Sequence, residues 1–182
     1  MRVLTLDIDG VLKFQHDVWQ DERGLFLETW NGRELANNGL AADFVQDNLS
    51  ISKQWTVRGL HYQIEQPQGK LIRVITGRIY DVIVDLRRHS PTFRRAIGVQ
   101  ICADDHESLW VPPGCAHGFL ALEHDARVAY KVTDYWAPQF ERTLLWSDPA
   151  LGISWPIRTG IHPIVSQKDA AGTPLDNAAY YE

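Results

Sequence analysis

The run of residues 70–86 constrains the fold more than any other stretch of the sequence. It reads KLIRVITGRIYDVIVDL, in which β-branched residues fill two segments on either side of Gly77. Side chains of a strand point alternately to its two faces, and β-branched residues are enriched in strands. We therefore predict two strands joined as a hairpin through residues 76–78. In the second strand one face would carry Tyr80, Val82, Val84 and Leu86, and the other Ile79, Asp81, Ile83 and Asp85.

Similar short segments recur along the chain between turns rich in Gly, Pro and Asp. Residues 95–101 and 127–136 are strand candidates, with the Pro- and Gly-containing run 109–119 between them, and residues 33–40 are the best helix candidate. Frequent short strands with little helix are typical of an antiparallel sandwich or barrel. A chain of 182 residues can bury its own core, so we expect one all-β domain over residues 1–182. We expect the small and polar residues of the segment 160–182, apart from the stretch 166–169, to be loosely ordered.

The overall charge and the cysteines limit the classes of partner. The net charge is −5 and the isoelectric point is about 5.8. Nucleic acids and anionic membranes select basic surfaces, so we expect neither as a partner. Cys102 and Cys115 have no CxxC spacing, and no stretch has the length of an apolar membrane span. We therefore expect free thiols and a cytoplasmic protein.

The first residues contain a motif with a second interpretation. Asp7-Ile8-Asp9-Gly10 follows an apolar strand and resembles the first motif of haloacid-dehalogenase-like phosphatases, in which one Asp is the nucleophile beside a magnesium ion. That fold requires alternating helices and strands after the motif, whereas this chain continues with strands and turns. We favour a terminal strand followed by a turn.

Two histidine-containing segments resemble the two-motif layout of cupin barrels. His61 lies in RGLHYQ, and His117 follows Pro113-Gly114 about fifty residues later. Metal-binding cupins carry His-x-His in the first motif, but here Gln63 occupies the place of the second His, and Glu65 follows too soon to be the usual carboxylate ligand. Two imidazoles rarely hold a metal without further protein ligands. We therefore predict a site that uses no metal and no cofactor.

Without a metal, His61 becomes a candidate general base, because imidazole exchanges protons near neutral pH. Lys70 could stabilise a developing oxyanion, or it could be a solvated strand end. Tyr130 and Trp136 have the same parity in the strand candidate 127–136, so they would share a face, which could equally belong to the core. Asp169 has the features of a surface charge near the end of the chain.

A set of motifs, taken together and in order, resembles the dTDP-4-dehydrorhamnose 3,5-epimerase family. The resemblance runs from about residue 7 to about residue 175. Its motifs are DERG at 21–24, FVQDN at 44–48, RGLHYQ at 58–63, QGKLIRV at 68–74, DVIVDLR at 81–87, SPTF at 90–93, AHGF at 116–119, YKVTDYW at 130–136 and SDPALGISWP at 147–156.

The resemblance implies a cupin-type jelly roll, without metal, that forms a homodimer in which N-terminal segments cross to the partner. The implied substrate is a dTDP-4-keto-6-deoxyhexose, dTDP-4-dehydro-6-deoxy-D-glucose, inverted at C3 and C5. By the same resemblance His61 is the base and Asp169 its orienting partner. Tyr130 returns a proton on the opposite face, and Lys70 stabilises the enolate.

The resemblance also implies a set of substrate-binding residues. Arginine pairs well with phosphate oxygens, so Arg23 and Arg58 are the candidates for the diphosphate. Trp136 lies where the family usually has a Tyr stacked on thymine. The other implied contacts are Phe26, Glu28, Gln46, Asp47, Asn48, His117, Glu141 and Lys168. Two alternatives stay open: a relative that inverts only C3 or only C5, and an inert cupin that binds a sugar nucleotide.

Overall fold

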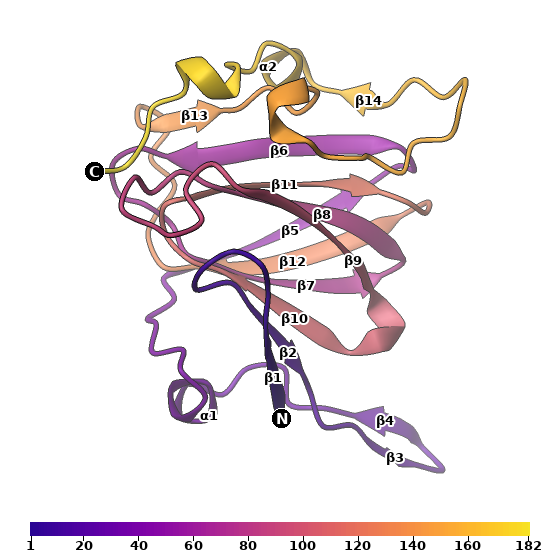
Figure 1. Cartoon of the computed structure of the whole chain (residues 1–182). Coiled ribbons are helices and arrows are strands. Elements are labelled where there is room, and N and C mark those ends of the chain that lie inside the picture. The colour runs from indigo at the N-terminus through magenta and orange to yellow at the C-terminus, as the bar shows by residue number, and fades with distance from the viewer.

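The computed structural model describes residues 1–182, which form two sheets packed face to face (Figure 1). The strands are β1 (Arg2–Thr5), β2 (Leu12–Gln15), β3 (Trp19–Asp21), β4 (Gly24–Phe26), β5 (Gln46–Ser52), β6 (Thr56–Gln63), β7 (Lys70–Thr76), β8 (Arg78–Asp85), β9 (Ala96–Cys102), β10 (Glu107–Val111), β11 (Cys115–Ala121), β12 (Ala126–Val132), β13 (Glu141–Thr143) and β14 (Ile164–Val165). The helices are α1 (Gly32–Asn37) and α2 (Gln167–Ala170), with single 3₁₀ turns η1 (Ala103–Asp105), η2 (Pro149–Leu151) and η3 (Leu175–Asn177). No helix is long and apolar enough to cross a membrane.

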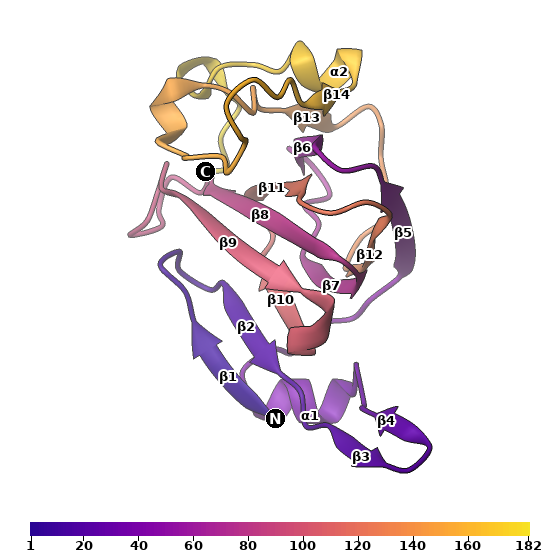
Figure 2. The same cartoon turned by 90° about the vertical axis from the view of Figure 1, so that its right-hand side faces the viewer.

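The chain alternates between the two sheets in a jelly-roll arrangement, which confirms the antiparallel all-β prediction. One sheet has the order β1-β2-β10-β7-β12-β5, and the other has the order β13-β6-β11-β8-β9 with β14 beside β6 (Figure 2). Every pairing within these two sheets is antiparallel except the short one between β14 and β6.

The predicted hairpin at residues 76–78 is wrong. β7 pairs with β10 and β12, whereas β8 pairs with β9 and β11 in the opposite sheet. Only Gly77 separates the two strands, and a hairpin needs at least two residues in its turn. Gly77, with φ of +78°, instead carries the chain across from one sheet to the other.

The residues of β8 divide between two faces as the alternating sequence predicted, and both faces are buried. Ile79 and Ile83 point between the sheets, where they join Ile72, Val74 and Phe119 in the larger apolar cluster. The opposite face of β8 packs in a second cluster beneath the end of the chain, formed by Leu60, Tyr62, Val82, Val84, Leu86, Ala116, Leu144, Leu151 and Leu175. Each fully buried aliphatic side chain contributes about 1.5–3 kcal/mol to folding.

The segment 160–182 packs against the β6 sheet, so the expectation of loose order is wrong. It contains β14, α2 and η3 and covers the sheet at the top of Figure 1. Leu175 is 2% exposed, and the Tyr181 hydroxyl donates to the Gln63 carbonyl. The small and polar composition of the segment concealed these few apolar anchors. They hold the segment in a position where Asp169 can bond His61 on β6.

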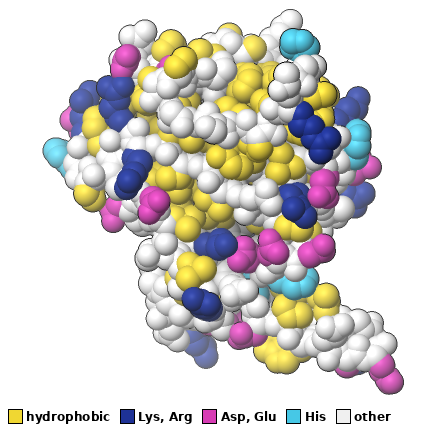
Figure 3. Space-filling model, turned by 45° about the vertical axis from the view of Figure 1, so that its right-hand side comes forward, with side chains coloured by type: hydrophobic (Ala, Val, Ile, Leu, Met, Phe, Trp, Pro, Cys, Tyr) yellow, Lys and Arg dark blue, Asp and Glu magenta, His cyan; other side chains and the backbone are white.

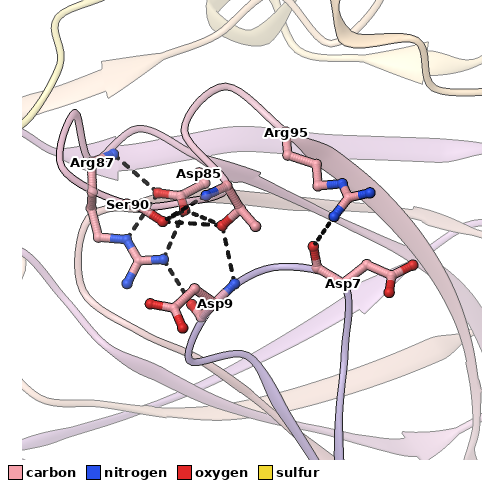
Figure 4. Close-up of polar contacts among 7 residues, drawn as sticks. Asp7, Asp9, Asp85, Arg87, Ser90 and Arg95 are labelled. Atoms are coloured by element: carbon pink, nitrogen blue, oxygen red, sulfur yellow. Dashed lines mark hydrogen bonds and ion pairs between the residues drawn. The ribbon is translucent and has the colours of Figure 1, made fainter.

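A buried carboxylate anchors the N-terminal turn to the β8–β9 connection (Figure 4). Asp85 is fully buried and accepts hydrogen bonds from the Arg87 guanidinium at 2.8 and 2.9 Å and from the hydroxyls of Ser90 and Thr92. Burial alone would raise the pKa of Asp85, but these donors outweigh that effect and lower it. The charge is therefore satisfied within the fold.

The Asp7-Ile8-Asp9-Gly10 motif is a turn between β1 and β2, as favoured over a phosphatase site. The Asp7 carbonyl accepts from Arg95, and the Asp9 carbonyl accepts from Arg87 (Figure 4). The Asp9 amide donates to Thr92 Oγ1. Backbone groups of the motif hold the turn against the body of the protein.

Helix α1 covers most of the predicted segment 33–40 but ends earlier. Asn31 caps it by accepting from the amides of Arg33 and Glu34, which begins the helix at Gly32. Its one buried residue, Leu35, packs in a small cluster with Phe14 and Trp110.

The predicted strand 127–136 also ends earlier, because β12 stops at Val132. Tyr130 does share the inward face with Val128, and both contact the core between the sheets. Trp136 lies beyond the strand and is 58% exposed, so the parity argument that grouped it with Tyr130 is wrong. The backbone leaves the strand where Gly69 amide and carbonyl groups bind Thr133.

β6 contains one extra residue opposite β11. The pairing His117↔His61 is followed by Phe119↔Arg58, so three steps on β6 match two on β11. This bulge coincides with a close contact of two glycines. A Cβ on Gly59 would lie 2.6 Å from Gly118 Cα, and a Cβ on Gly118 would lie 2.4 Å from the Arg58 carbonyl oxygen. Only glycine at both positions allows the two backbones to approach this closely.

The two-stranded arm β3–β4 projects from the body and pairs with no other strand (Figure 1). All six of its strand residues are exposed, among them Trp19, Leu25 and Phe26. Figure 3 shows hydrophobic side chains near the base of the arm and acidic side chains at its tip. An isolated two-stranded hairpin is only marginally stable in water. The arm therefore presents an apolar surface that this chain does not cover.

We predict that Gly59→Ala destabilises the protein by about 3 kcal/mol or more, since the added methyl group combines a backbone clash with an unfavourable positive φ. The φ of Gly59 is +117°. The measurement is the free energy of unfolding in urea.

Gly39→Ala is the matched control, because Gly39 has φ of +93° and no atom within 4 Å of the added Cβ. It should cost only about 1 kcal/mol, the price of the backbone conformation alone. Equal losses in the two variants would show that the contact with Gly118 is unimportant.

Candidate active site

A cavity of about 740 Å³ lies between the two sheets on the side of β5 and β6. Strands of both sheets supply its walls, and β14 and α2 close one end. The cavity gathers most of the residues singled out from the sequence. These are Gln46, Asn48, Arg58, His61, Lys70, His117, Tyr130, Trp136, Glu141, Lys168 and Asp169.

The bulge in β6 explains how two of these side chains reach the same cavity. Arg58 and His61 are three residues apart, so a regular strand would point them to opposite faces. The extra residue changes this parity, and both side chains line the cavity. Arg58 is held by hydrogen bonds from its guanidinium to Ser52 Oγ and the Ile51 carbonyl.

His61 and Asp169, distant in sequence, form a hydrogen-bonded pair. His61 Nε2 donates to Asp169 Oδ1 at 2.7 Å, and the Gly59 amide donates to the other oxygen at 3.2 Å. Asp169 lies on α2, whose first turn is capped by Ser166. Burial would raise the pKa of Asp169, but the His61 and Gly59 donors lower it overall. The carboxylate is therefore charged and fixes the ring of His61 with Nδ1 free.

Lys70 is 7% exposed at the start of β7 and lines the same cavity. Burial lowers the pKa of its ammonium group to about 8, despite the opposing charges of Glu141 and Asp81. The group is still mostly protonated at neutral pH. It provides a buried positive charge, and a charge acts strongly where the surroundings have a low dielectric constant.

Tyr130 reaches the cavity from β12, in the sheet opposite to that of His61. Burial raises the pKa of its phenol, although the charge of Arg58 opposes this effect. The hydroxyl is therefore protonated at neutral pH and can donate a proton.

His117 belongs to a second buried pair, with Asp81. His117 Nε2 lies 2.8 Å from Asp81 Oδ2, and the two residues are 8% and 0% exposed. Burial raises the pKa of Asp81, opposed by the charges of His117 and Lys70. Asp81 was not among the residues predicted from the sequence. The available signal was a carboxylate placed between Ile79 and Ile83 on one face of a strand.

The rim of the cavity carries an exposed aromatic ring, that of Trp136, and half-buried amide side chains. Gln46 donates to Asn48 Oδ1 at 2.9 Å and accepts from the Trp136 amide at 3.1 Å. This bond fixes the segment that carries the Trp136 ring. Nearby, the Lys168 ammonium lies 2.6 Å from Glu141 Oε2 and joins α2 to β13.

Four residues implied by the resemblance do not reach this cavity. Arg23, Phe26 and Glu28 are exposed on or just after the arm, and Arg23 pairs with Asp21. Asp47 faces the other side of β5 and binds Lys131 at 2.9 Å, because it alternates with Gln46 and Asn48 along the strand. Asp47 lines a second cavity, of about 440 Å³, on the outer face of the sheet.

Gln63, which stands in place of a metal-binding His, has a structural role. Its side chain donates to the carbonyls of Gln66 and Tyr135 and accepts from the Ala137 amide. The Gln63 amide therefore makes its hydrogen bonds to the backbone of two loops. No group of three or more His, Cys, Asp or Glu side chains is arranged to hold a metal ion. The absence of a metal from the reaction stays a prediction.

The arrangement suits the removal and return of a proton beside a carbonyl group. A base with an orienting carboxylate, a buried ammonium and a protonated phenol converge on one space from different strands. Carbon acids next to a ketone require this combination of an aligned base and positive charge near the oxygen.

Comparison with known proteins identifies the family. The family model for dTDP-4-dehydrorhamnose 3,5-epimerase matches residues 5–177. The epimerase of that name from Pseudomonas aeruginosa is 44% identical over 179 residues, which cover 98% of each chain.

Two solved structures have the same fold. The dTDP-6-deoxy-D-glucose-3,5-epimerase from Legionella pneumophila, in complex with dTDP-4-keto-L-rhamnose, has a TM-score of 0.92 and 38% identity and covers 98% of this chain and 94% of its own. A 3'-monoepimerase from Streptomyces bikiniensis, in complex with dTDP-quinovose, has a TM-score of 0.87 and 31% identity, with coverage of 94% and 86%. The chain belongs to the dTDP-4-dehydrorhamnose 3,5-epimerase family of isomerases.

Proposed function

We propose that this protein inverts C3 and C5 of dTDP-4-dehydro-6-deoxy-D-glucose and so forms dTDP-4-dehydro-L-rhamnose. The observation that carries the proposal is the convergence of the His61–Asp169 pair, Lys70 and Tyr130 on one cavity, in a chain of this family. The two inverted carbons flank the C4 ketone, so one base and one oxyanion site can serve both.

The reaction begins with His61 as the general base. Its Nδ1 removes the proton from the carbon next to the ketone, and the electron pair of that C–H bond moves to the carbonyl oxygen. Asp169 keeps the ring oriented and stabilises the imidazolium that forms. Lys70 stabilises the negative oxygen of the enolate.

Tyr130 completes the inversion from the opposite face. Its hydroxyl gives a proton to the carbon as the ketone re-forms, and solvent restores the phenol and removes the proton from His61. The same cycle then acts at the second carbon after the ring readjusts. Tyr130 and His61 come from opposite sheets, which suits proton transfer on two faces.

The nucleotide is held toward the rim of the cavity. Arg58 and Lys168 supply positive charge for the diphosphate, and Trp136 supplies a flat surface for the base. Gln46, Asn48, Glu141 and His117 supply the remaining polar contacts from this chain.

The active form is a homodimer whose arms cross between subunits. The arm exposes Trp19, Leu25 and Phe26, and the outer face of the β5-β12-β7 sheet exposes Leu49 and Ile75. Asp47 and Lys131 line the cavity on that outer face. Covering these surfaces would bring Arg23, Phe26 and Glu28 to the partner's site and assign Asp47 to the contact region. The free thiols of Cys102 and Cys115 fit a cytoplasmic location.

A mono-epimerase is the second candidate, because the 3'-monoepimerase of Streptomyces bikiniensis shares 31% identity and the fold. The two functions differ in whether the Tyr130 hydroxyl can reach one carbon of the sugar or both C3 and C5.

Proton exchange in deuterium oxide tests the proposal directly. We expect wild-type protein to incorporate deuterium from solvent at both C3 and C5 of the authentic substrate, as followed by NMR. His61→Ala should abolish exchange, and Asp169→Asn should slow it roughly 100-fold or more, since the ring loses its orienting charge.

Asp176→Asn is the control for charge loss in the same C-terminal segment, because Asp176 pairs only with Arg94 at the surface. Exchange at one carbon alone would identify a mono-epimerase, and no exchange would identify an inert binding protein. A chelator should leave exchange unchanged.

We predict that Lys70→Met stabilises the protein at pH 7 by about 1–3 kcal/mol, since the variant no longer buries an ammonium group. The same change should lower kcat roughly 100-fold or more. Urea unfolding and steady-state kinetics give the two values.

The sign follows from the lowered pKa. Between about pH 8 and the ordinary value of 10.5, the unfolded chain binds more protons at Lys70 than the folded chain. The free energy of unfolding of the wild-type protein therefore rises with pH over that window. The difference in stability between Lys70→Met and the wild type becomes smaller. Lys70 in the folded protein loses its proton, and with it the positive charge, as the pH rises through about 8. We therefore expect kcat to fall above about pH 8. An advantage that is constant from pH 7 to 10.5 would contradict this account.

Intersubunit complementation tests the crossed arms. We expect His61→Ala and the double variant Arg23→Ala/Phe26→Ala to have little activity separately. Coexpressed, they should recover roughly a quarter of wild-type activity, because half of the dimers then contain one site with an intact base and an intact arm. If each arm serves its own chain, coexpression recovers nothing.

A further inference from the structure

The Asp169 carboxylate fills a gap in the hydrogen-bond ladder along one edge of β6. β14 pairs with residues 56–57 of this edge, and β13 pairs with residues 61–63. Between them the Gly59 amide donates to Asp169 Oδ2 at 3.2 Å, where a neighbouring strand would otherwise supply a carbonyl group. Asp169 Oδ1 is 2.7 Å from His61 Nε2. Both bonds therefore depend on how far the backbone that carries Asp169 stands from β6.

That distance is set by residues 164–173, a segment that we call the strap. Helix α2, with Asp169, lies in the middle of the strap and above β6 (Figure 1). One end of the strap is β14, which pairs with β6. At the other end the Thr173 amide donates to the Thr143 carbonyl at 2.8 Å, and the Thr173 carbonyl accepts from the Leu145 amide at 2.9 Å. The strap is thus attached to the sheet on both sides of Asp169.

The second attachment requires glycine at position 172. A Cβ on Gly172 would lie 2.6 Å from the carbonyl carbon and oxygen of Leu144 and 2.6 Å from the Leu145 amide nitrogen, all of them backbone atoms. Leu144 cannot retreat, because it is fully buried and exchanges two backbone hydrogen bonds with Leu60 on β6. A side chain at position 172 would therefore push the strap outward by about 1 Å to reach an ordinary carbon–carbon separation.

An outward shift at Gly172 would be transmitted to Asp169. The Gly172 amide donates to the Asp169 carbonyl at 3.3 Å, and the Asp169 amide donates to Ser166 Oγ at 3.1 Å. These bonds tie the residues around Asp169 into one turn. A displacement of about 1 Å would lengthen the bond to His61 beyond the range of about 3.2 Å in which N–H···O hydrogen bonds are strong.

We propose that Gly172 is a positioning residue for the reaction: its missing side chain lets the strap lie against Leu144, and this places Asp169 where it can orient the His61 ring. The inference rests on the proposed function, since it gives His61 the role of the base. Gly172 does not line the cavity and acts through Asp169.

Gly172→Ala tests the proposal by NMR and by kinetics. In wild-type protein we expect the ¹⁵N shifts of the neutral His61 ring to report a proton on Nε2 alone, because Asp169 accepts from that atom. In Gly172→Ala they should report a mixture of the two tautomers. Deuterium exchange into the sugar should slow roughly 100-fold, the loss that a misplacement of about 1 Å can cause. The effect should be larger on kcat than on KM.

Gly160→Ala is the matched control, because it adds the same methyl group just before the strap. An added Cβ at Gly160 meets no atom within 4 Å, although φ is +84°. The control should therefore lose some stability and keep both the wild-type tautomer and the wild-type exchange rate. The wild-type tautomer in folded Gly172→Ala protein, or equal changes in the two variants, would overturn the proposal.

Amide hydrogen exchange of wild-type protein tests the same inference without any variant that has to fold. If the strap holds Asp169, the amides of Gly59 and Thr173 are released by the same opening, and their protection factors should agree within roughly tenfold. A larger difference would show that the Asp169 contact opens independently of the strap and would overturn the proposal. The NMR readouts need no substrate. Failure of wild-type protein to exchange protons with the dTDP-sugar would therefore refute the proposed function alone.

Discussion

The contact between Gly59 and Gly118 is the constraint on which the site depends. It requires two strands of one sheet to approach so closely that a methyl group on either residue would meet the opposite backbone. The extra residue of β6 lies at this point and turns Arg58 and His61 to the same side. The Gly59 amide, freed from a regular ladder, donates to Asp169. One local irregularity thereby aligns the Arg58 cation, the His61 imidazole and the carboxylate that orients this imidazole.

The remainder of the barrel supplies the stability that this site uses. Aliphatic residues such as Ile72, Ile79 and Ile83 fill the space between the sheets, and each is almost fully buried. At the end toward β5 and β6 the same space contains Lys70 and Asp81, whose burial disfavours their charged forms. An apolar interior is a poor solvent for charge and therefore makes each remaining charge act strongly on a bound ligand. The cost to folding and the benefit to chemistry have the same physical origin.

The sequence predicted local structure well in β8 and in the N-terminal turn, but it placed the end of β12 four residues too late. The two faces of β8 follow from its alternation, and the turn at Asp7–Gly10 follows from its residues. The predicted hairpin at Gly77 failed because strand pairing depends on which sheet each strand joins. The packing of the final segment was missed because a few anchors, Leu175 and Tyr181 among them, lie in a polar background.

The candidate site shows the same division between local and distant information. Pattern alone indicated His61 and Lys70, but only the resemblance selected Asp169, since 108 residues separate it from His61. Strand parity explains why the side chain of Asp47 points away from the cavity, whereas those of Gln46 and Asn48 line it. The residues of the arm have no place in the site of their own chain, so no property of an isolated strand could have located them.

The two His–Asp pairs of the cavity are alike in geometry and opposite in electrostatics. The donors around Asp169 outweigh its burial and lower its pKa, whereas burial prevails at Asp81 and raises it. A carboxylate that is firmly charged favours an imidazolium next to it, so the His61 pair is suited to accept a proton from carbon. The Asp81 pair holds its own proton more strongly and is less suited to that step. Two similar pairs are therefore separated in proton affinity by their surroundings, and the His61 pair is the one suited to proton transfer.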